Sequence, residues 1–232
     1  MHSRKLWLAT TAVAALATAQ QAQADGMYVS VFGGANFQKD DSHVAGSIPT
    51  YFEIHNTDPD TGFVIGGAIG TGLDNWVKGL RVELEASYRR NDVGGDWQDG
   101  FTFYGAYTNT GSIDANSSTF AIMANVAYDI EMGWKIKPYV MGGAGWARTK
   151  FEGAEFFTGG GTNTSFDVEN SGFAWQLGAG FNYEVAPGVD VGLGYRYFDG
   201  PNSSYFAGKN IAPIDHDNTN HSVMVNLTID TN

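Results

Sequence analysis

Beyond the first 24 residues, two places in the chain put a serine hydroxyl next to a histidine, as a nucleophile and its general base would require. These are Asp41-Ser42-His43 and His221-Ser222. Acyl transfer needs the hydroxyl, the imidazole and an orienting carboxylate within hydrogen-bond reach of one another. His221 and Ser222 fall in a strand-like segment, where neighbouring side chains leave opposite faces, so His221 does not activate Ser222 directly. In Asp41-Ser42-His43, the three residues are neighbours in a loop, and this does not place their side chains in a catalytic geometry. We therefore assign no catalytic residue.

Acidic side chains are densest at Asp58-Pro59-Asp60 and at Asp215-His216-Asp217. Oxygen ligands at alternate positions suit Ca²⁺, but neither segment matches a full EF-hand loop. The chain contains no cysteine, which excludes disulfides, thiolate metal sites and a cysteine nucleophile. The glycine runs, such as 159–161, lack the Lys-Ser/Thr pair that follows a phosphate-binding loop. The sequence predicts no metal site and no cofactor.

Charged residues alternate with apolar ones in one segment of the chain. Across 80–89, apolar side chains occupy every even position and polar or charged side chains every odd position. On a β-strand this pattern gives one apolar face and one polar face. If the polar faces of several strands enclose a narrow lumen, opposite charges meet there and neutralise one another. The residues that we expect in this interior charge network are Arg81, Glu83, Glu85, Asp129, Glu184 and Arg196.

The same period of two recurs along the rest of the chain and predicts eight strands. Their expected ranges are 27–37, 62–71, 79–90, 118–130, 136–148, 172–185, 189–199 and 221–230. Most are about ten residues long, whereas strands of soluble sheets are usually about 5–6 residues long. A tilted strand needs about 9–11 residues to cross a bilayer. The lengths therefore favour strands that span a membrane.

Short and long connections alternate between the predicted strands. Short turns follow the second, fourth and sixth strands, at 72–78, 131–135 and 186–188. Long loops follow the first, third, fifth and seventh strands, at 38–61, 91–117, 149–171 and 200–220. Short turns at one rim and long loops at the other are typical of bacterial outer-membrane barrels. An even number of strands returns both termini to the short-turn, periplasmic rim.

The period of two does not say whether the apolar face meets a protein core or lipid. A secreted lipocalin-type barrel also has eight strands, with its apolar face inward. Mixed charges on the polar rows, the strand lengths and aromatic residues near the ends of the apolar rows favour the opposite arrangement. Those aromatic residues are Phe37, Phe63, Trp76, Tyr88, Phe120, Tyr128, Trp134, Trp146, Phe173, Trp175, Tyr183 and Tyr197. We therefore predict an all-β fold, an eight-stranded antiparallel transmembrane β-barrel with its apolar rows against lipid.

The first 24 residues have the three parts of a secretory signal peptide. Arg4 and Lys5 precede an apolar stretch at 6–19, and Ala22-Gln23-Ala24 provides the cleavage pattern. We expect cleavage after Ala24 and a barrel domain over 25–232. No later segment holds 18 uninterrupted apolar residues, so the sequence predicts no membrane-spanning helix in the mature chain.

The formal net charge of −12 over 232 residues argues against nucleic acid, whose phosphates need a basic surface. The four predicted long loops hold 15 of the acidic residues and only three basic residues, Lys39, Lys150 and Lys209. The rest of the predicted mature chain has ten acidic and eight basic residues, so the barrel body is nearly neutral. Two interpretations stay open: the acidity keeps the loops soluble, or it recruits basic partners and divalent cations.

The pattern resembles the small eight-stranded outer-membrane barrels of the OmpA-transmembrane-domain and opacity-protein type. The residues that carry the resemblance are Met27-Tyr28-Val29-Ser30-Val31-Phe32-Gly33-Gly34, Lys137-Pro138-Tyr139-Val140, Val191-Gly192-Leu193-Gly194-Tyr195-Arg196-Tyr197 and His221-Ser222-Val223. They are spread over essentially the whole predicted mature chain. The chain departs from these barrels in ending Ile229-Asp230-Thr231-Asn232 where an aromatic residue usually stands.

The resemblance implies a Gram-negative outer-membrane surface protein with a structural or antigenic role and loops available for adhesion. It implies outer-membrane lipid and lipopolysaccharide as partners, an extracellular or host ligand at the loops, no nucleic acid and a monomer. A narrow porin-like channel stays open as an alternative, although eight strands leave an interior only about wide enough for side chains to fill. A lipid-A-modifying enzyme is a further alternative.

Overall fold

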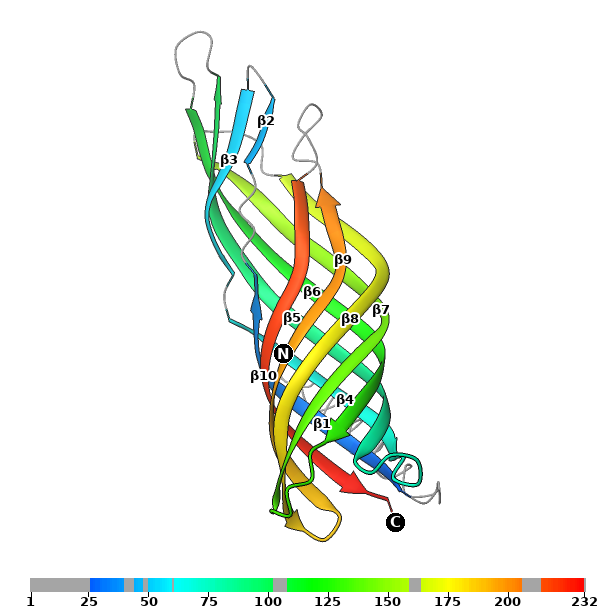
Figure 1. Ribbon diagram of the computed structural model, residues 1–232. Helices are drawn as coiled ribbons and strands as arrows, with labels where there is room; N and C mark the ends of the chain where they lie inside the picture. The colour runs from blue at the N-terminus through cyan, green and yellow to red at the C-terminus, as the bar shows by residue number, and fades with distance from the viewer. Residues whose placement is uncertain are drawn as a thin grey trace, which may run out of the picture.

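The computed structural model describes residues 26–39, 44–47, 50–59, 61–101, 108–158, 164–205 and 214–231. These residues form ten strands in one sheet (Figure 1). The strands are β1 (Met27–Gln38), β2 (Val44–Ser47), β3 (Thr50–Pro59), β4 (Gly62–Gly72), β5 (Leu80–Phe101), β6 (Thr108–Asp129), β7 (Ile136–Thr158), β8 (Thr164–Ala186), β9 (Val189–Tyr205) and β10 (Ile214–Asp230). In this described part of the chain, no helix is long and apolar enough to cross a membrane.

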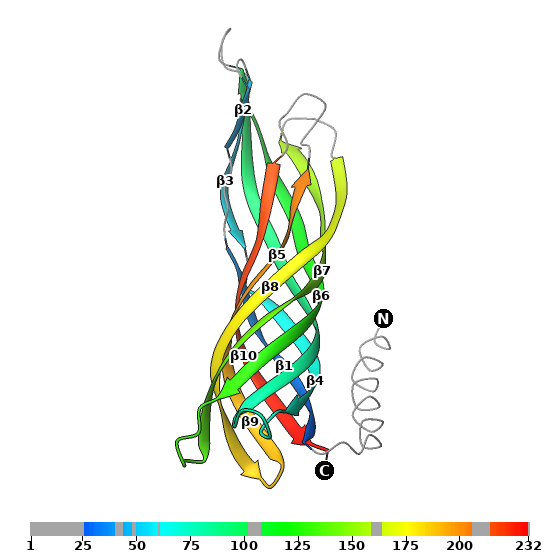
Figure 2. The same cartoon turned by 45° about the vertical axis from the view of Figure 1, so that its right-hand side comes forward.

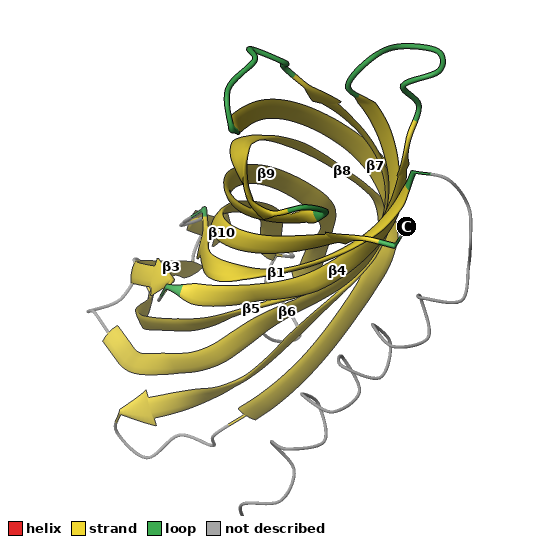
Figure 3. Cartoon of the chain, turned by 90° about the horizontal axis from the view of Figure 1, so that it is seen from below, coloured by secondary structure: helices red, strands yellow, loops and turns green. Residues whose placement is uncertain are grey.

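Eight of the strands, β1 and β4 to β10, close into a barrel. Each pairs antiparallel with its neighbours in chain order, and β1 completes the ring by pairing with β10 from Tyr28↔Asp230 to Gln38↔Asn220. Seen from below, the strands curve round into a ring (Figure 3). Closure matters because lipid offers no hydrogen-bond partner to a free strand edge. The predicted fold class, an eight-stranded antiparallel barrel, is confirmed.

The wall has its apolar side chains outside and its polar side chains inside. On β5, Leu84 is 53% exposed, whereas the next residue, Glu85, is 1% exposed. On β8, exposed Leu177 follows the fully buried Gln176 in the same way. This facing is the inverse of a lipocalin-type barrel, which is thereby excluded. The lumen is too narrow to hold bulk water, so the polar side chains inside it must form hydrogen bonds and ion pairs with one another.

Exposed aromatic side chains collect at two levels of the outer surface. At the upper level Trp146 lies opposite Phe173 in the ladder between β7 and β8, and Tyr88 lies opposite Phe120 between β5 and β6. Trp175 and Tyr197 stack beside them with ring centroids 5.2 Å apart. At the lower level are exposed Tyr128, Trp134 and Tyr183. Such belts mark the two interfaces of a bilayer.

The lower rim consists of three short turns at the predicted places, and a glycine at positive φ lies in or directly after each predicted range. These glycines are Gly79, Gly133 and Gly188, with φ of 81°, 72° and 72°. A side chain is strained at such φ values, which glycine adopts at little cost. Both ends of the barrel also meet at this rim, where the Thr231 amide donates to the Met27 carbonyl at 2.9 Å.

The strands extend further upward than the sequence predicts. Much of 91–117 and 149–171, expected as long loops, continues β5, β6, β7 and β8 as paired strand. The expected loop 38–61 contains the hairpin of β2 and β3, which adds to the upper part of β5 (Figure 2). Above the membrane neither face of a strand must be apolar, so the backbone keeps pairing where the period of two fades from the sequence.

The wall is continuous only in its lower part. β8 and β9 pair no higher than Trp175↔Asp199, and above that level β8 pairs with β7 while β9 pairs with β10. Pro201 follows on β9 and has no amide proton to give to a ladder. The upper region therefore divides into a broad sheet and the separate β9–β10 hairpin.

Candidate functional site: the charged lumen

The lower layer of the lumen is built around Arg81 on β5. Its Nε and Nη2 donate to the two carboxylate oxygens of Asp129 on β6, at 2.7 and 2.9 Å. Its Nη1 donates to Glu83 Oε1 at 2.7 Å, and the Tyr28 hydroxyl donates to the same oxygen at 2.7 Å. One guanidinium group thus holds two carboxylates. Side-on pairing of this kind is the strong, directional form of the Arg–carboxylate interaction.

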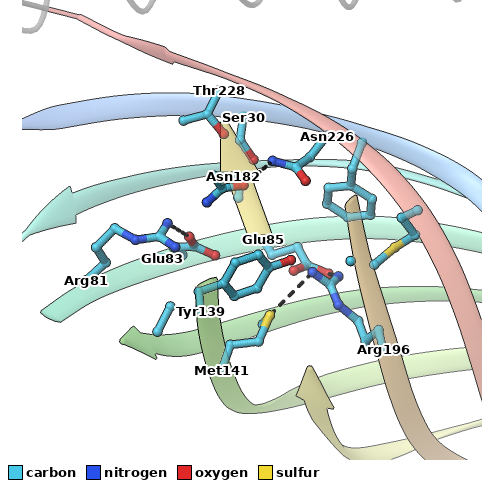
Figure 4. Close-up of a pocket in the computed structure, with 15 residues that line it drawn as sticks. Ser30, Arg81, Glu83, Glu85, Tyr139, Met141, Asn182, Arg196, Asn226 and Thr228 are labelled. Atoms are coloured by element: carbon cyan, nitrogen blue, oxygen red, sulfur yellow. Dashed lines mark hydrogen bonds and ion pairs between the residues drawn. The ribbon is translucent and has the colours of Figure 1, made fainter. Parts of the chain in front are cut away.

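The middle layer is built around Glu85, whose side chain is fully enclosed. Arg196 on β9 donates to Glu85 Oε1 at 2.7 Å (Figure 4). Asn125 and Gln176 donate to the other oxygen, Oε2, at 2.9 and 3.3 Å. The Arg196 guanidinium also lies over the Phe32 ring, 4.8 Å from its centroid. Three strands, β6, β8 and β9, therefore contribute donors to this one carboxylate of β5.

Arg89 lies above these layers, on the same inward row of β5. It is 1% exposed, and its guanidinium lies over the Phe198 ring, 3.9 Å from the centroid. Its Nη1 donates to the Ser87 hydroxyl at 3.1 Å. Phe198 packs in a cluster with Ala121, Met123, Ala147 and Ala174.

Near the upper end the lumen is filled by uncharged polar side chains. The Asn36 amide donates to Asn91 at 2.5 Å and to Asn220 at 2.7 Å, and accepts from the Ser222 hydroxyl at 2.6 Å. Asn218 continues this network to the hydroxyl of Thr149 at 2.7 Å. All six of these side chains are buried.

The six residues predicted to form the interior network lie in three places. Arg81, Glu83 and Asp129 form the lower layer, and Glu85 with Arg196 forms the middle one. Glu184 lies apart from both: it sits half-exposed near the lower rim, and its nearest cation is Lys137 at 3.7 Å. We expected it to face the arginines across the lumen, but it lies just before the turn between β8 and β9, where water still reaches it.

Sequence reasoning missed the uncharged members of the lumen. Tyr28, Asn125 and Gln176 complete the charged layers, and the asparagine network fills the upper end. A signal was present: Asn36, Asn91 and Asn125 fall on the polar phase of their strands. A search for charged residues overlooks these amides, although an amide side chain can also satisfy a buried donor or acceptor.

A cavity of about 40 Å³ lies between the lower and middle layers. Its lining includes Arg81, Glu83, Glu85, Tyr139 and Arg196 (Figure 4). That volume holds a few water molecules and no larger solute. Charged groups around it are paired with one another, so the site as built is a polar core rather than a reaction centre.

The serine–histidine pairs provide no catalytic arrangement in the described residues. His221 faces outward, with its Nδ1 2.5 Å from the Tyr195 hydroxyl, while Ser222 faces inward and bonds Asn36. The triplet at 41–43 lies outside the described residues. The side chains of both acidic clusters also lie outside them, and the described side chains include no group of three or more potential metal ligands.

At the lower rim, two of the short turns are joined by a single ion pair. Lys78, in the turn after β4, contacts Glu131, in the turn after β6. The hydrogen bond to Glu131 raises the pKa of the Lys78 amine above its usual value. Both side chains are largely exposed, so this pair contributes little to stability.

A closed wall with a lipid-facing apolar surface, two aromatic belts and paired charges inside defines a membrane-spanning β-barrel. The sequence profile of the outer membrane protein beta-barrel domain matches residues 7–228. The chain belongs to this family. It is therefore a protein of the cell outer membrane, as the sequence predicts.

Solved structures of outer-membrane proteins share this fold. Neisserial surface protein A is 16% identical, with a TM-score of 0.50 over 88% of this chain and 97% of that one. The outer membrane protease OmpT of Escherichia coli is 10% identical, with a TM-score of 0.51 over 90% and 99%. OprG of Pseudomonas aeruginosa is 16% identical, with a TM-score of 0.47 over 88% and 96%. No curated protein sequence matches the chain significantly.

Proposed function

We propose that this protein is a structural surface protein of the outer membrane whose projecting wall binds molecules outside the cell. The observation that carries the proposal is the length of that wall. β5 continues from Tyr88, in the upper aromatic belt, to Phe101, and β7 continues from Trp146 to Thr158. About 9–11 residues suffice for a strand to span the bilayer. The additional length places ordered sheet outside the membrane, where spanning does not require it.

The upper part of β8 supplies an edge at which an extended partner can dock. From Thr164 to Ala174 its ladder partner among the described residues is β7 alone. An unpaired edge offers a row of amide and carbonyl groups to which a further strand can add. Asp167 and Glu169 lie on this edge strand and pair with Lys150 and Arg148 of β7. Because these pairs are exposed they are weak, and a basic partner can compete for the carboxylates. The edge therefore suits an extended polypeptide segment that carries basic side chains.

The outer surface just above the upper belt suits the phosphates of lipopolysaccharide. Arg90 on β5 and Arg148 and Lys150 on β7 all face outward there, with β6 between the two strands. Arg148 lies opposite Phe120 in the ladder, so its charge is one step from the aromatic belt. Each of the three has an acidic neighbour, as Arg148 has Glu169 at 2.5 Å. Mixed charges of this kind bind phosphate directly and through divalent cations.

The proposal assigns neither conduction nor catalysis to the barrel. Against conduction stand the three filled layers, because a solute would have to break the Glu85–Arg196 pair to pass. Planar-bilayer recordings of the wild type and of Glu83→Ala should show no unitary currents. Against catalysis stands His221, the only histidine whose side chain is described, which has Tyr195 rather than a carboxylate as its partner. Purified lipopolysaccharide should release no acyl chains on incubation with the protein.

The docking role is tested by peptide binding to the full chain in lipid nanodiscs. The probe is a fluorescent peptide of alternating lysine and valine, about ten residues long. We expect binding that weakens in high salt and in the double variant Asp167→Asn, Glu169→Gln, because both changes remove charge attraction. Glu131→Gln, at the opposite rim, is the matched control and should bind as the wild type does. Equal binding of a peptide with proline at alternate positions would exclude strand addition, and no binding would reject the proposal.

A further inference from the structure

Arg89 differs from Arg81 and Arg196, the other two arginines of the lumen, because none of its guanidinium nitrogens binds a carboxylate. Its Nε and Nη2 are buried and have no hydrogen-bond partner. Arg196 also has a buried Nε without a partner, but its Nη1 donates to Glu85. In Arg81, Nε and Nη2, which point side by side, bind both oxygens of Asp129 at 2.7 and 2.9 Å. The side-on edge of a guanidinium group is the geometry that recognises an anion. In Arg89 this edge has nothing to recognise among the described side chains.

The charges around Arg89 leave it without compensation. Glu85, four residues away on β5, already accepts from Arg196 at 2.7 Å and from Asn125 at 2.9 Å. Arg196 lies two residues from Phe198 on β9, the ring on which Arg89 stacks. The guanidinium groups of Arg89 and Arg196 thus lie in neighbouring layers of the lumen, and the one carboxylate there, Glu85, is bound to Arg196.

Both neighbours of Arg89 fail to replace a counter-charge. The Ser87 hydroxyl accepts one hydrogen bond, and the Phe198 face offers a cation–π contact. An enclosed cation with unsatisfied donors is costly in a medium that lacks bulk water. Because Arg89 is 1% exposed, its charge does not reach solvent by a small change of rotamer.

We propose that the side-on edge of Arg89 binds a small monovalent anion, of the size of a halide, inside the lumen. The anion accepts from Nε and Nη2 and offsets the charge of Arg89, which no carboxylate among the described side chains neutralises. Because the edge is enclosed, we expect it to accept a compact ion and to exclude a bulky one such as gluconate. The inference stands on the lumen geometry and is independent of any partner at the cell surface.

The proposal is tested on the full chain in detergent micelles, with bromide as the probe. Unfolding is followed in sodium bromide and in sodium gluconate at equal ionic strength. At about ten times the Kd, an ion that binds only the folded state lowers the unfolding equilibrium constant about tenfold. Crystals grown in bromide should show anomalous density within hydrogen-bond distance of the Arg89 edge.

Two variants and one control separate this site from a general salt effect. Arg89→Met removes the donors and should lose the difference between bromide and gluconate. Ser87→Asp places a carboxylate beside Arg89 and should also lose it, while being more stable in gluconate than the wild type. Arg148→Gln alters an exposed arginine on the outer wall and should keep the full bromide effect.

Three results would overturn the proposal. The first is a wild-type protein equally stable in the two salts. The second is a bromide effect that persists in Arg89→Met, or in Ser87→Asp if the methionine variant does not fold. The third is a water molecule at the Arg89 edge in the bromide crystals, or a direct bond from that edge to the Gln176 carbonyl oxygen, which is likewise buried without a partner.

Discussion

The lower and upper halves of the lumen solve the same packing problem with different chemistry. Below, Arg81 and Glu85 organise two layers in which each carboxylate meets a guanidinium group. Above, Asn36 and Asn218 organise a network with no formal charge. Both halves are buried and both are hydrogen-bonded, so burial alone does not distinguish them. The two halves differ in the group that loses its partner when one side chain is removed. In the lower half that group is charged, and in the upper half it is an uncharged amide or hydroxyl.

The largest effect is expected for Glu85→Ala in the lower half. The change leaves Arg196 without its carboxylate, close to Arg89, and also frees the amide donor of Asn125. Breaking one side of a buried pair typically costs about 3–5 kcal/mol. Urea unfolding in micelles, followed by tryptophan fluorescence, measures the loss. Glu152→Ala, on the exposed outer wall, is the control and should lose far less.

Asn36→Ala tests the upper half and should cost less than Glu85→Ala. It leaves Asn91, Asn220 and Ser222 each short of one partner, but no charge is exposed to a low dielectric. An unsatisfied buried polar group costs roughly 1–3 kcal/mol. The same unfolding assay applies. If Asn36→Ala were as damaging as Glu85→Ala, the distinction between the two halves would fail.

Tyr28→Phe removes two hydrogen bonds from the lower half, one donated to Glu83 and one accepted from Arg81, without breaking an ion pair. Glu83 keeps its contact with Arg81 at 2.7 Å, and the ring of residue 28 stays in place. We expect a loss of about 1–2 kcal/mol, since one hydrogen bond is usually worth about 1 kcal/mol net. A loss as large as that of Glu85→Ala would mean that Tyr28, rather than the arginine, holds the layer together.

Lys78→Ala, outside the lumen, should have the smallest effect. Glu131 raises the pKa of Lys78, so the contribution of this pair is present below the unfolded pKa of lysine, about 10.4, and is lost as pH rises through the folded value. Both side chains are largely exposed, so the loss of stability at neutral pH should be small. The difference between the variant and the wild type should vanish as the pH rises through the folded pKa of Lys78. A large loss of stability at neutral pH would show that the rim, and not the lumen, holds the barrel closed.

The sequence predicts the part of the molecule that the bilayer constrains. Leu84 faces lipid and Glu85 faces the lumen. Because every spanning strand has one row against lipid and one away from it, apolar and polar residues alternate along its sequence. The short turns are predictable for a similar reason, since Gly188 has to adopt positive φ there. The pairing of Arg81 with Asp129 follows from the two lying on neighbouring strands near the same rim.

The sequence does not predict the structure above the upper belt or the pairing of side chains in the lumen. Segment 91–101 has glycines and acidic residues, which suggest a loop. Its backbone nevertheless pairs with β3 and β6, because above the membrane a strand can pair without having an apolar face. Glu184 shares the polar phase with Glu85 but lies at the rim, because its height in the tilted barrel depends on the register. Arg89 looks like Arg81 in the sequence, and only the three-dimensional arrangement shows that its donors lack a carboxylate.

The central claim, that apolar rows meet lipid while charged rows meet one another, is tested by a single-cysteine scan along β5. The chain has no cysteine of its own, so each variant carries one nitroxide label. Collision with oxygen dissolved in the lipid is measured for labels at 80, 82, 84, 86 and 88, and for inward positions 87 and 91. The account predicts high collision rates at the even positions and low rates at 87 and 91. High rates at 87 and 91, with low rates at 82 and 84, would contradict it.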